Sequence, residues 1–170
     1  EEFQLLRSRL RYFNVDRQMQ VIAVTSARPD EGKTTVAGGL AYAMALASKK
    51  VLLLEVDFRR PTLGSRLGMH HSAGLSGLLT DDVGQDSQEV DYSQRVYSID
   101  AGESTLDVLV AGHTPPNPGK ILESERMMQL LSRLRMDYDY VVIDTPPTCI
   151  VSDAFPIMAK ADGVLLVARS

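Results

Sequence analysis

The sequence has no long apolar run, only one cysteine and no excess of basic residues. The longest apolar stretch, residues 37–47, contains two glycines and falls well short of the ~20 residues that a membrane-spanning helix needs. Cys149 has no second cysteine to pair with, which favours a reducing compartment. The formal net charge of −4 argues against nucleic acid as a partner. We therefore expect a cytoplasmic domain, with any membrane segments outside residues 1–170.

Short apolar runs alternate with helix-like segments along the 170 residues. The runs are continuous, as in parallel strands that are covered on both faces. Apolar residues spaced three and four positions apart indicate helices between them. This alternation predicts a single α/β domain, a mostly parallel sheet flanked by helices with ligands at the carboxyl ends of the strands. The expected strands are 21–25, 51–54, 96–99, 106–110, 140–143 and 163–168, and the main expected helices are 1–13, 36–47, one beginning near Ser124, and 152–160.

Two further expectations concern the less regular parts of the chain. Residues 81–91 are acidic and polar, which predicts an exposed loop, and Tyr92 beside it is the tyrosine expected to be exposed. The last apolar run, 163–168, is interpreted as a central strand. A domain rarely ends there, so we expect a further helix and strand beyond Ser170.

The loop after the first expected strand carries a phosphate-binding motif. It lies between a strand and a helix and matches G-x-x-x-x-G-K-[ST], except that Ala27 replaces the first glycine. In such a P-loop, backbone N–H groups and the start of a helix face an anion. Lys33 would contact the β- and γ-phosphates, Thr34 would bind Mg²⁺, and Thr35 would donate to an α-phosphate oxygen. The expected nucleotide-binding residues are therefore Ala27, Asp30, Glu31, Gly32, Lys33, Thr34 and Thr35.

Acidic residues follow two further expected strands. Asp144 follows the run 140–143 and fits a Walker B acid, which holds water bound to Mg²⁺. Glu55 and Asp57 follow the run 51–54, where an acid near Mg²⁺ can orient or deprotonate an attacking hydroxyl. Two plainer interpretations stay open: Asp144 as a simple strand-end turn, and the other two acids as an exposed turn neutralised by a neighbouring arginine.

Five segments of the sequence carry a family resemblance. Residues 51–61 contain the acidic pair followed by Arg-Pro, and residues 109–118 contain Pro-Pro-Asn-Pro. With residues 121–127, 139–147 and 152–154, they resemble the bacterial tyrosine kinases (BY-kinases), which are cytoplasmic kinase domains of capsular and exopolysaccharide assembly proteins. The resemblance implies a P-loop NTPase-like fold, ATP and Mg²⁺ as cofactors, and γ-phosphoryl transfer to protein tyrosine, largely between subunits.

The resemblance also implies roles for individual residues. Glu55 stands where the family has aspartate, so the carboxylate lies one methylene further out, and ~1 Å of misplacement can cost ~10²-fold in rate. The catalytic residues implied are Lys33, Glu55, Asp57 and Asp144, and the metal-binding residues implied are Thr34, Glu55 and Asp144.

The first residues resemble the family's Glu-x-x-Arg-x-x-Arg oligomerisation motif, aligned as Glu1, Gln4 and Arg7, with Gln4 in place of the first arginine. We expect residues 1–14 to form an N-terminal amphipathic helix and residues 15–170 the P-loop kinase-like domain. The resemblance implies a ring-shaped homo-oligomer and a transmembrane co-polymerase or adaptor segment, which would hold the domain at the inner face of the membrane. An ordinary amphipathic helix packed on its own domain is the alternative.

Two other functions stay open. Glu55 and Gln4 are compatible with a non-catalytic, nucleotide-dependent module that sets polysaccharide chain length. A partitioning-type P-loop ATPase is the other alternative. It is disfavoured by Arg28, which stands where such ATPases carry lysine, and by the Arg-Pro that follows the acidic pair.

Overall fold

A computed structural model describes residues 1–12, 19–69, 73–80 and 90–169. Most of the loop expected over residues 81–91, and the boundary expected between residues 14 and 15, lie outside the described residues. The helices are α1 (Glu2–Tyr12), α2 (Lys33–Ala45), α3 (Leu63–Arg66), α4 (Gly74–Thr80), α5 (Pro118–Leu122), α6 (Glu125–Asp137) and α7 (Phe155–Met158), with a 3-10 turn η1 (Ser93–Arg95). The strands are β1 (Val21–Ser26), β2 (Val51–Glu55), β3 (Tyr97–Ala101), β4 (Ser104–Leu109), β5 (Tyr140–Asp144) and β6 (Gly163–Val167).

The strands form one sheet in the order β3-β4-β2-β5-β1-β6. All neighbouring pairs are parallel except β3 and β4, which form an antiparallel hairpin. Every residue of β1 and β2 is buried, because helices cover both faces of the sheet there. The predicted α/β class and the mostly parallel sheet are therefore confirmed.

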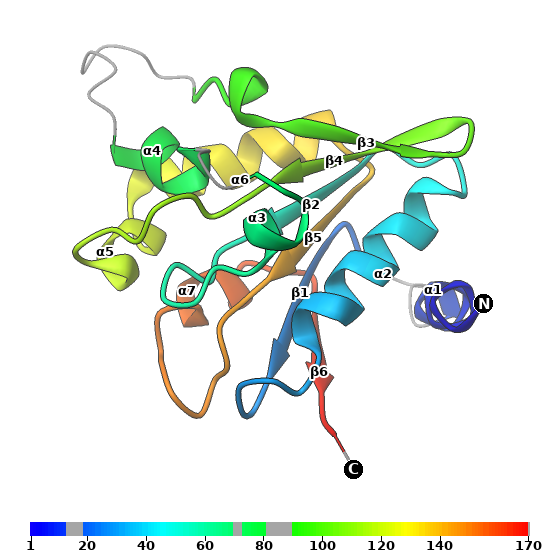
Figure 1. Ribbon diagram of the computed structural model, residues 1–170, viewed down its shortest axis with the longest axis horizontal. Coiled ribbons are helices and arrows are strands. Elements are labelled where there is room, and N and C mark those ends of the chain that lie inside the picture. The colour runs from blue at the N-terminus through cyan, green and yellow to red at the C-terminus, as the bar shows by residue number, and fades with distance from the viewer. Residues whose placement is uncertain (13–18, 70–72, 81–89, 170) are drawn as a thin grey trace.

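Helices lie on both faces of the sheet (Figure 1). The apolar residues of α2 join one core cluster, together with Leu53 of β2 and Val142 of β5. Those of α4, α6 and α7 join a second cluster, together with Leu54 of β2 and Ile143 of β5. Successive residues of β2 and β5 thus point to opposite faces, so the two cores are separate layers.

The crossover connections diverge between β1 and β5. From β1 the chain passes through α2 on one face to β2, and from β5 it passes through α7 on the other face to β6. Ligands of open α/β sheets bind where connections diverge in this way, beyond the carboxyl ends of the strands. The P-loop follows β1 and Asp144 ends β5, so both flank this crevice.

Helix α1 packs on its own domain. Phe3 lies against the backbone of Gly39 in α2, so closely that a side-chain carbon added to Gly39 would come within 2.3 Å of the ring. Leu6 and Leu10 pack against the core cluster that contains α2. The amphipathic helix expected at 1–13 is therefore present, and its apolar side is used within the chain.

Within residues 1–170, β6 is the outermost strand of the sheet, with Leu166 63% exposed, and the further helix and strand expected beyond Ser170 stay predictions. Two expectations about single segments are wrong in detail. The helix expected over 152–160 covers only Phe155–Met158, with Pro156 in its first turn as expected, because the chain then turns so that Asp162 can bond to β1. Tyr92 is only partly exposed, since its hydroxyl donates to Asp137 at 2.6 Å.

Two backbone segments cross in contact where α4 begins. The N–H groups of Leu75 and Ser76 donate to the carbonyl oxygens of Val110 and Ala111, at 2.8 and 2.9 Å. A side-chain carbon on Gly112 would lie 2.1 Å from the carbonyl oxygen of Ala73. This crossing fixes α4 against the segment that follows β4.

We predict that Gly112→Ala lowers the free energy of unfolding by about 2–5 kcal/mol, because it adds a steric overlap to the cost of a positive φ. Gly68→Ala is the matched control, since Gly68 also has positive φ (72°) but no heavy atom within 4 Å of the added carbon. It should cost only about 1–2 kcal/mol in urea unfolding. Equal losses of unfolding free energy in the two variants would contradict the close approach of Gly112 to the backbone of Ala73.

Candidate functional site

The P-loop has the backbone expected of a phosphate-binding loop. Gly32 is the N-cap of α2 and has φ 96°, a left-handed conformation that disfavours other residues. Among the described non-glycine residues, only Asp30 and Ser48 have positive φ. Ala27 therefore needs none of the conformational freedom of the glycine it replaces, and the departure from the motif is accommodated.

The structure brings Lys33 to two of the predicted acids. The Lys33 Nζ lies 3.1 Å from Oδ2 of Asp57 and 3.8 Å from Oδ1 of Asp144. All three side chains are buried. Asp57 follows β2, Asp144 ends β5, and Lys33 begins the helix that follows β1, and these three strands are neighbours in the sheet. Because the lysine follows β1 and the acids follow β2 and β5, only the folded sheet could assemble this cluster.

Asp144 is the acid whose charge the protein leaves least compensated. It is 1% exposed, and neither of its carboxylate oxygens has a hydrogen-bond partner. Burial raises the pKa of Asp144 to about 6, although the nearby Lys33 ammonium and the Thr34 hydroxyl lower it in part. A buried carboxylate without hydrogen bonds is costly, so this position fits a cation that the protein itself does not supply.

Glu55 is held differently from the other two acids. One carboxylate oxygen accepts the backbone N–H groups of Thr62 and Leu63, at 2.7 and 2.8 Å, and the other accepts the N–H of Ala111 at 3.0 Å. Three such bonds satisfy much of its charge. Glu55 thus ties the start of α3 and the segment after β4 to the end of β2, and its expected catalytic and metal-binding roles stay predictions.

A cavity of about 90 Å³ opens beside the P-loop. This volume is well below the roughly 300–1,000 Å³ of pockets that enclose a whole ligand, so it suits phosphate groups with the rest of a nucleotide outside. Five of the residues that line it were not predicted from the sequence, and three of these, Arg60, Thr62 and Arg66, follow the acidic pair within ten positions. The lining residues are Pro29, Asp30, Gly32, Lys33, Thr34, Thr35, Asp57, Arg60, Thr62, Arg66 and Pro147.

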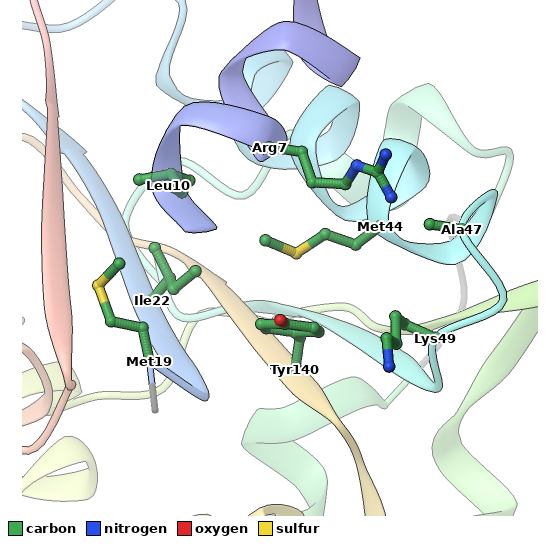
Figure 2. Close-up of a pocket in the computed structure, with 8 residues that line it drawn as sticks. All are labelled: Arg7, Leu10, Met19, Ile22, Met44, Ala47, Lys49 and Tyr140. Atoms are coloured by element: carbon green, nitrogen blue, oxygen red, sulfur yellow. The ribbon is translucent and has the colours of Figure 1, made fainter. Parts of the chain in front are cut away.

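Larger cavities lie away from this site. Figure 2 shows one of about 310 Å³ between α1, the end of α2 and the amino ends of β1 and β5, with Arg7 and Lys49 at its wall and Tyr140 below. Another, of about 480 Å³, is lined by residues that include Tyr92 and Tyr138. The P-loop cavity is smaller than both, yet it is the one that the charged cluster faces.

The donor set fits magnesium bound together with a nucleotide. Among the described residues, no three His, Cys, Asp or Glu side chains are arranged as a metal cage. Mg²⁺ is usually held by one or two carboxylates and by substrate phosphates rather than by an all-protein cage. The Asp144 carboxylate, which lacks hydrogen bonds, and the Thr34 hydroxyl beside the cavity are compatible with that mode.

The model of a protein family described as "AAA domain" matches residues 19–170 of the chain. Fold and site together define a P-loop nucleotide-binding domain. The chain is 38% identical, over all 170 residues, to tyrosine-protein kinase YwqD of Bacillus subtilis and covers 68% of that protein. The solved kinase domain of Escherichia coli tyrosine kinase ETK is 33% identical, with a TM-score of 0.85 over 99% of this chain and 62% of that one. The chain belongs to the bacterial tyrosine kinase family.

The relatives differ in how much of their length the chain covers. Against full-length tyrosine-protein kinase Etk of Escherichia coli K12, 33% identical, the chain spans only 22% of the protein. Cobyrinic acid a,c-diamide synthase of Mycobacterium smegmatis, solved with bound ADP and magnesium, is 22% identical with a TM-score of 0.68, over 87% of this chain and 58% of that one. At that identity the likeness shows the fold alone.

We predict that Asp144→Asn stabilises the nucleotide-free protein at pH 8. The pKa of Asp144 is raised to about 6 in the folded state. Its unfolded value is about 3.9, so the folded state holds the extra proton and stability falls as pH rises between these values. Asparagine avoids this loss, and unfolding in urea should show a gain of about 1–3 kcal/mol at pH 8 that disappears at pH 4.

Asp57→Asn is the matched comparison within the same cluster. It removes the carboxylate 3.1 Å from the Lys33 ammonium, so it should lower stability at pH 8. Mg·ATP should raise the melting temperature of the unmodified protein but not that of Asp144→Asn. A loss of stability in Asp144→Asn at pH 8 would contradict a carboxylate that is buried without hydrogen bonds.

We predict that Glu55→Asp, the change to the residue that the family resemblance implies at this position, destabilises this chain. The shorter side chain cannot reach all three N–H groups that Glu55 bonds, so about 1–3 kcal/mol of unfolding free energy should be lost. Glu103→Asp, at an exposed position, is the control for the same chemical change. If Glu55→Asp unfolds at the same urea concentration as the unmodified protein, the three bonds do not anchor the site.

Proposed function

We propose that this domain binds Mg·ATP and transfers the γ-phosphoryl group to the hydroxyl of a protein tyrosine. The observation that carries the proposal is the buried cluster of Lys33, Asp57 and Asp144 beside the P-loop cavity. Its carboxylates outnumber its ammonium group, and Asp144 lacks a hydrogen-bond partner, which supports a metal ion at this position. Membership of the bacterial tyrosine kinase family supports tyrosine as the acceptor.

Each residue of the cluster has a role in this proposal. Lys33 leaves its aspartate partners in part to neutralise the β- and γ-phosphates, while Thr34 and Asp144 hold the metal ion. Bound Mg²⁺ would neutralise charge on the phosphates. The Asp57 carboxylate lines the cavity, whereas that of Glu55 accepts backbone N–H groups, which supports Asp57 as the acid that would orient the tyrosine hydroxyl and accept its proton.

A second candidate function rests on Glu55. Its carboxylate accepts three backbone N–H groups, although the family's aspartate is expected to act at the metal or on the tyrosine. A chain that uses this acid as an anchor could bind nucleotide without phosphorylating tyrosine. It would then be a nucleotide-dependent module that sets polysaccharide chain length. The partitioning-type ATPase has no such observation in its favour.

We also propose that the domain works at the inner face of the membrane, joined to a transmembrane co-polymerase or adaptor, and that copies assemble through α1. None of the described helices is long and apolar enough to cross a membrane. Glu1, just before α1, and Gln4 on α1 are exposed and available to a second copy, whereas Arg7 is partly buried and its Nε has no hydrogen-bond partner. Transfer between copies would follow from such an assembly.

We predict that the full-length protein gains phosphotyrosine when incubated with Mg·ATP, and that Lys33→Met lowers this signal at least ~100-fold, because a positive charge at the phosphates is lost. Immunodetection of phosphotyrosine together with mass spectrometry measures the product. Mixing the two proteins tests transfer between copies, since the Lys33→Met chain should be labelled only when the active chain is present.

The controls separate the candidate functions. Calorimetric titration with ATP shows whether the unmodified protein binds nucleotide at all. Binding without phosphotyrosine would reject the kinase and favour the chain-length module. ATP hydrolysis that rises with DNA, again without phosphotyrosine, would favour the partitioning-type ATPase.

A further inference from the structure

Arg66 is a cation of the phosphate cavity that no phosphate-binding motif includes. It is the last residue of α3 and lines the same cavity as Lys33 and Thr34. Its Nη1 donates to the Thr35 hydroxyl at 3.1 Å. Helix α3 therefore makes a side-chain contact with the P-loop from outside it.

The position of α3 depends on Glu55. The carboxylate of Glu55 accepts the N–H groups of Thr62 and Leu63, which are the N-cap and the first residue of α3. Glu55 itself ends β2 and pairs in register with Asp144 of β5. Arg66 is thus attached, through one short helix and a buried carboxylate, to the strands that carry the charged cluster.

The direction of the hydrogen bond decides what Thr35 can do. A guanidinium can only donate, so the Thr35 oxygen is the acceptor in its bond with Arg66. The hydroxyl proton of Thr35 is then free to point elsewhere. An anion in the cavity would receive that proton's hydrogen bond, and Arg66 would hold the hydroxyl in the orientation that gives it.

Arg66 also keeps donors available for an anion. Arg59, Arg133 and Arg135 each form an ion pair with an aspartate, whereas no ion pair in the described part of the chain involves Arg66. The guanidinium has five N–H donors in a planar fork that matches phosphate oxygens. The residue is exposed, so a ligand can reach these donors without displacing protein contacts.

We propose that Arg66 and Thr35 act as one unit that binds the α-phosphate of the nucleotide. This inference rests on the proposed nucleotide binding and extends it to a residue outside the P-loop. Lys33 serves the β- and γ-phosphates in the proposed function, and Arg66 adds a cation that its bond to Thr35 holds on the Thr35 side of the cavity. Arg66 contributes equally to ADP and ATP binding, because both nucleotides have an α-phosphate.

Calorimetric titration of the full-length protein with ADP and with ATP, in the presence of MgCl₂, tests the proposal. Arg66→Ala is expected to weaken both nucleotides about 10-fold, as for the loss of a hydrogen bond to a charged group at an exposed site. Arg66→Lys keeps the charge but loses the planar fork of donors. Its affinity for each nucleotide should therefore lie between those of the unmodified protein and Arg66→Ala. Thr35→Val should also weaken binding, and the double variant should lose less than the product of the single losses.

The controls distinguish the outcomes. Arg9→Ala, an exposed arginine on α1, measures the effect of net charge alone and should leave both affinities unchanged. The melting temperature without nucleotide should be nearly the same in Arg66→Ala, because the side chain is exposed. Failure of the unmodified protein to bind nucleotide would reject the proposed function itself. Normal binding by Arg66→Ala, a loss confined to ATP, or losses that multiply in the double variant would each overturn this inference alone.

Discussion

The structure depends on placing three carboxylates and one ammonium group out of water at the ends of adjacent strands. Charges in a protein interior are tolerated only where partners offset the loss of hydration. Here Lys33 offsets Asp57 at 3.1 Å, backbone N–H groups offset Glu55, and Asp144 is left with no hydrogen bond. Burial of the Asp144 carboxylate raises its pKa, and the nearby Lys33 ammonium offsets that rise only in part.

The surrounding fold supports this cluster at each level. Parallel strands buried on both faces bring their carboxyl ends to one edge of the sheet, and the diverging crossovers leave a crevice there. Gly32 lets the chain turn into α2 so that Lys33 points back toward β2 and β5. The anchor at Glu55 then holds α3, and with it Arg66, over the same crevice. Structure and electrostatics therefore converge on the same few residues.

Glu55 shows how one acidic side chain at the end of a strand can brace a site. The longer side chain of glutamate reaches the amides of Thr62, Leu63 and Ala111 and becomes a brace between three segments. In this arrangement Asp57 and Asp144 are the acids that remain directed at Lys33. Glu55 therefore contributes to the site by fixing the positions of the backbone at Thr62, Leu63 and Ala111.

The sequence by itself determined the α/β class, most strands and helices, and the phosphate-binding loop, because buried parallel strands and P-loops leave short, local patterns. It also indicated which acids follow which strands. Only the tertiary structure decided that Tyr92 is bonded to Asp137 and that Glu55 accepts backbone N–H groups. It alone placed Arg66 beside Thr35, 31 positions away in the chain. Such contacts depend on how strands are ordered and how far a side chain reaches across the sheet, and no local pattern encodes either.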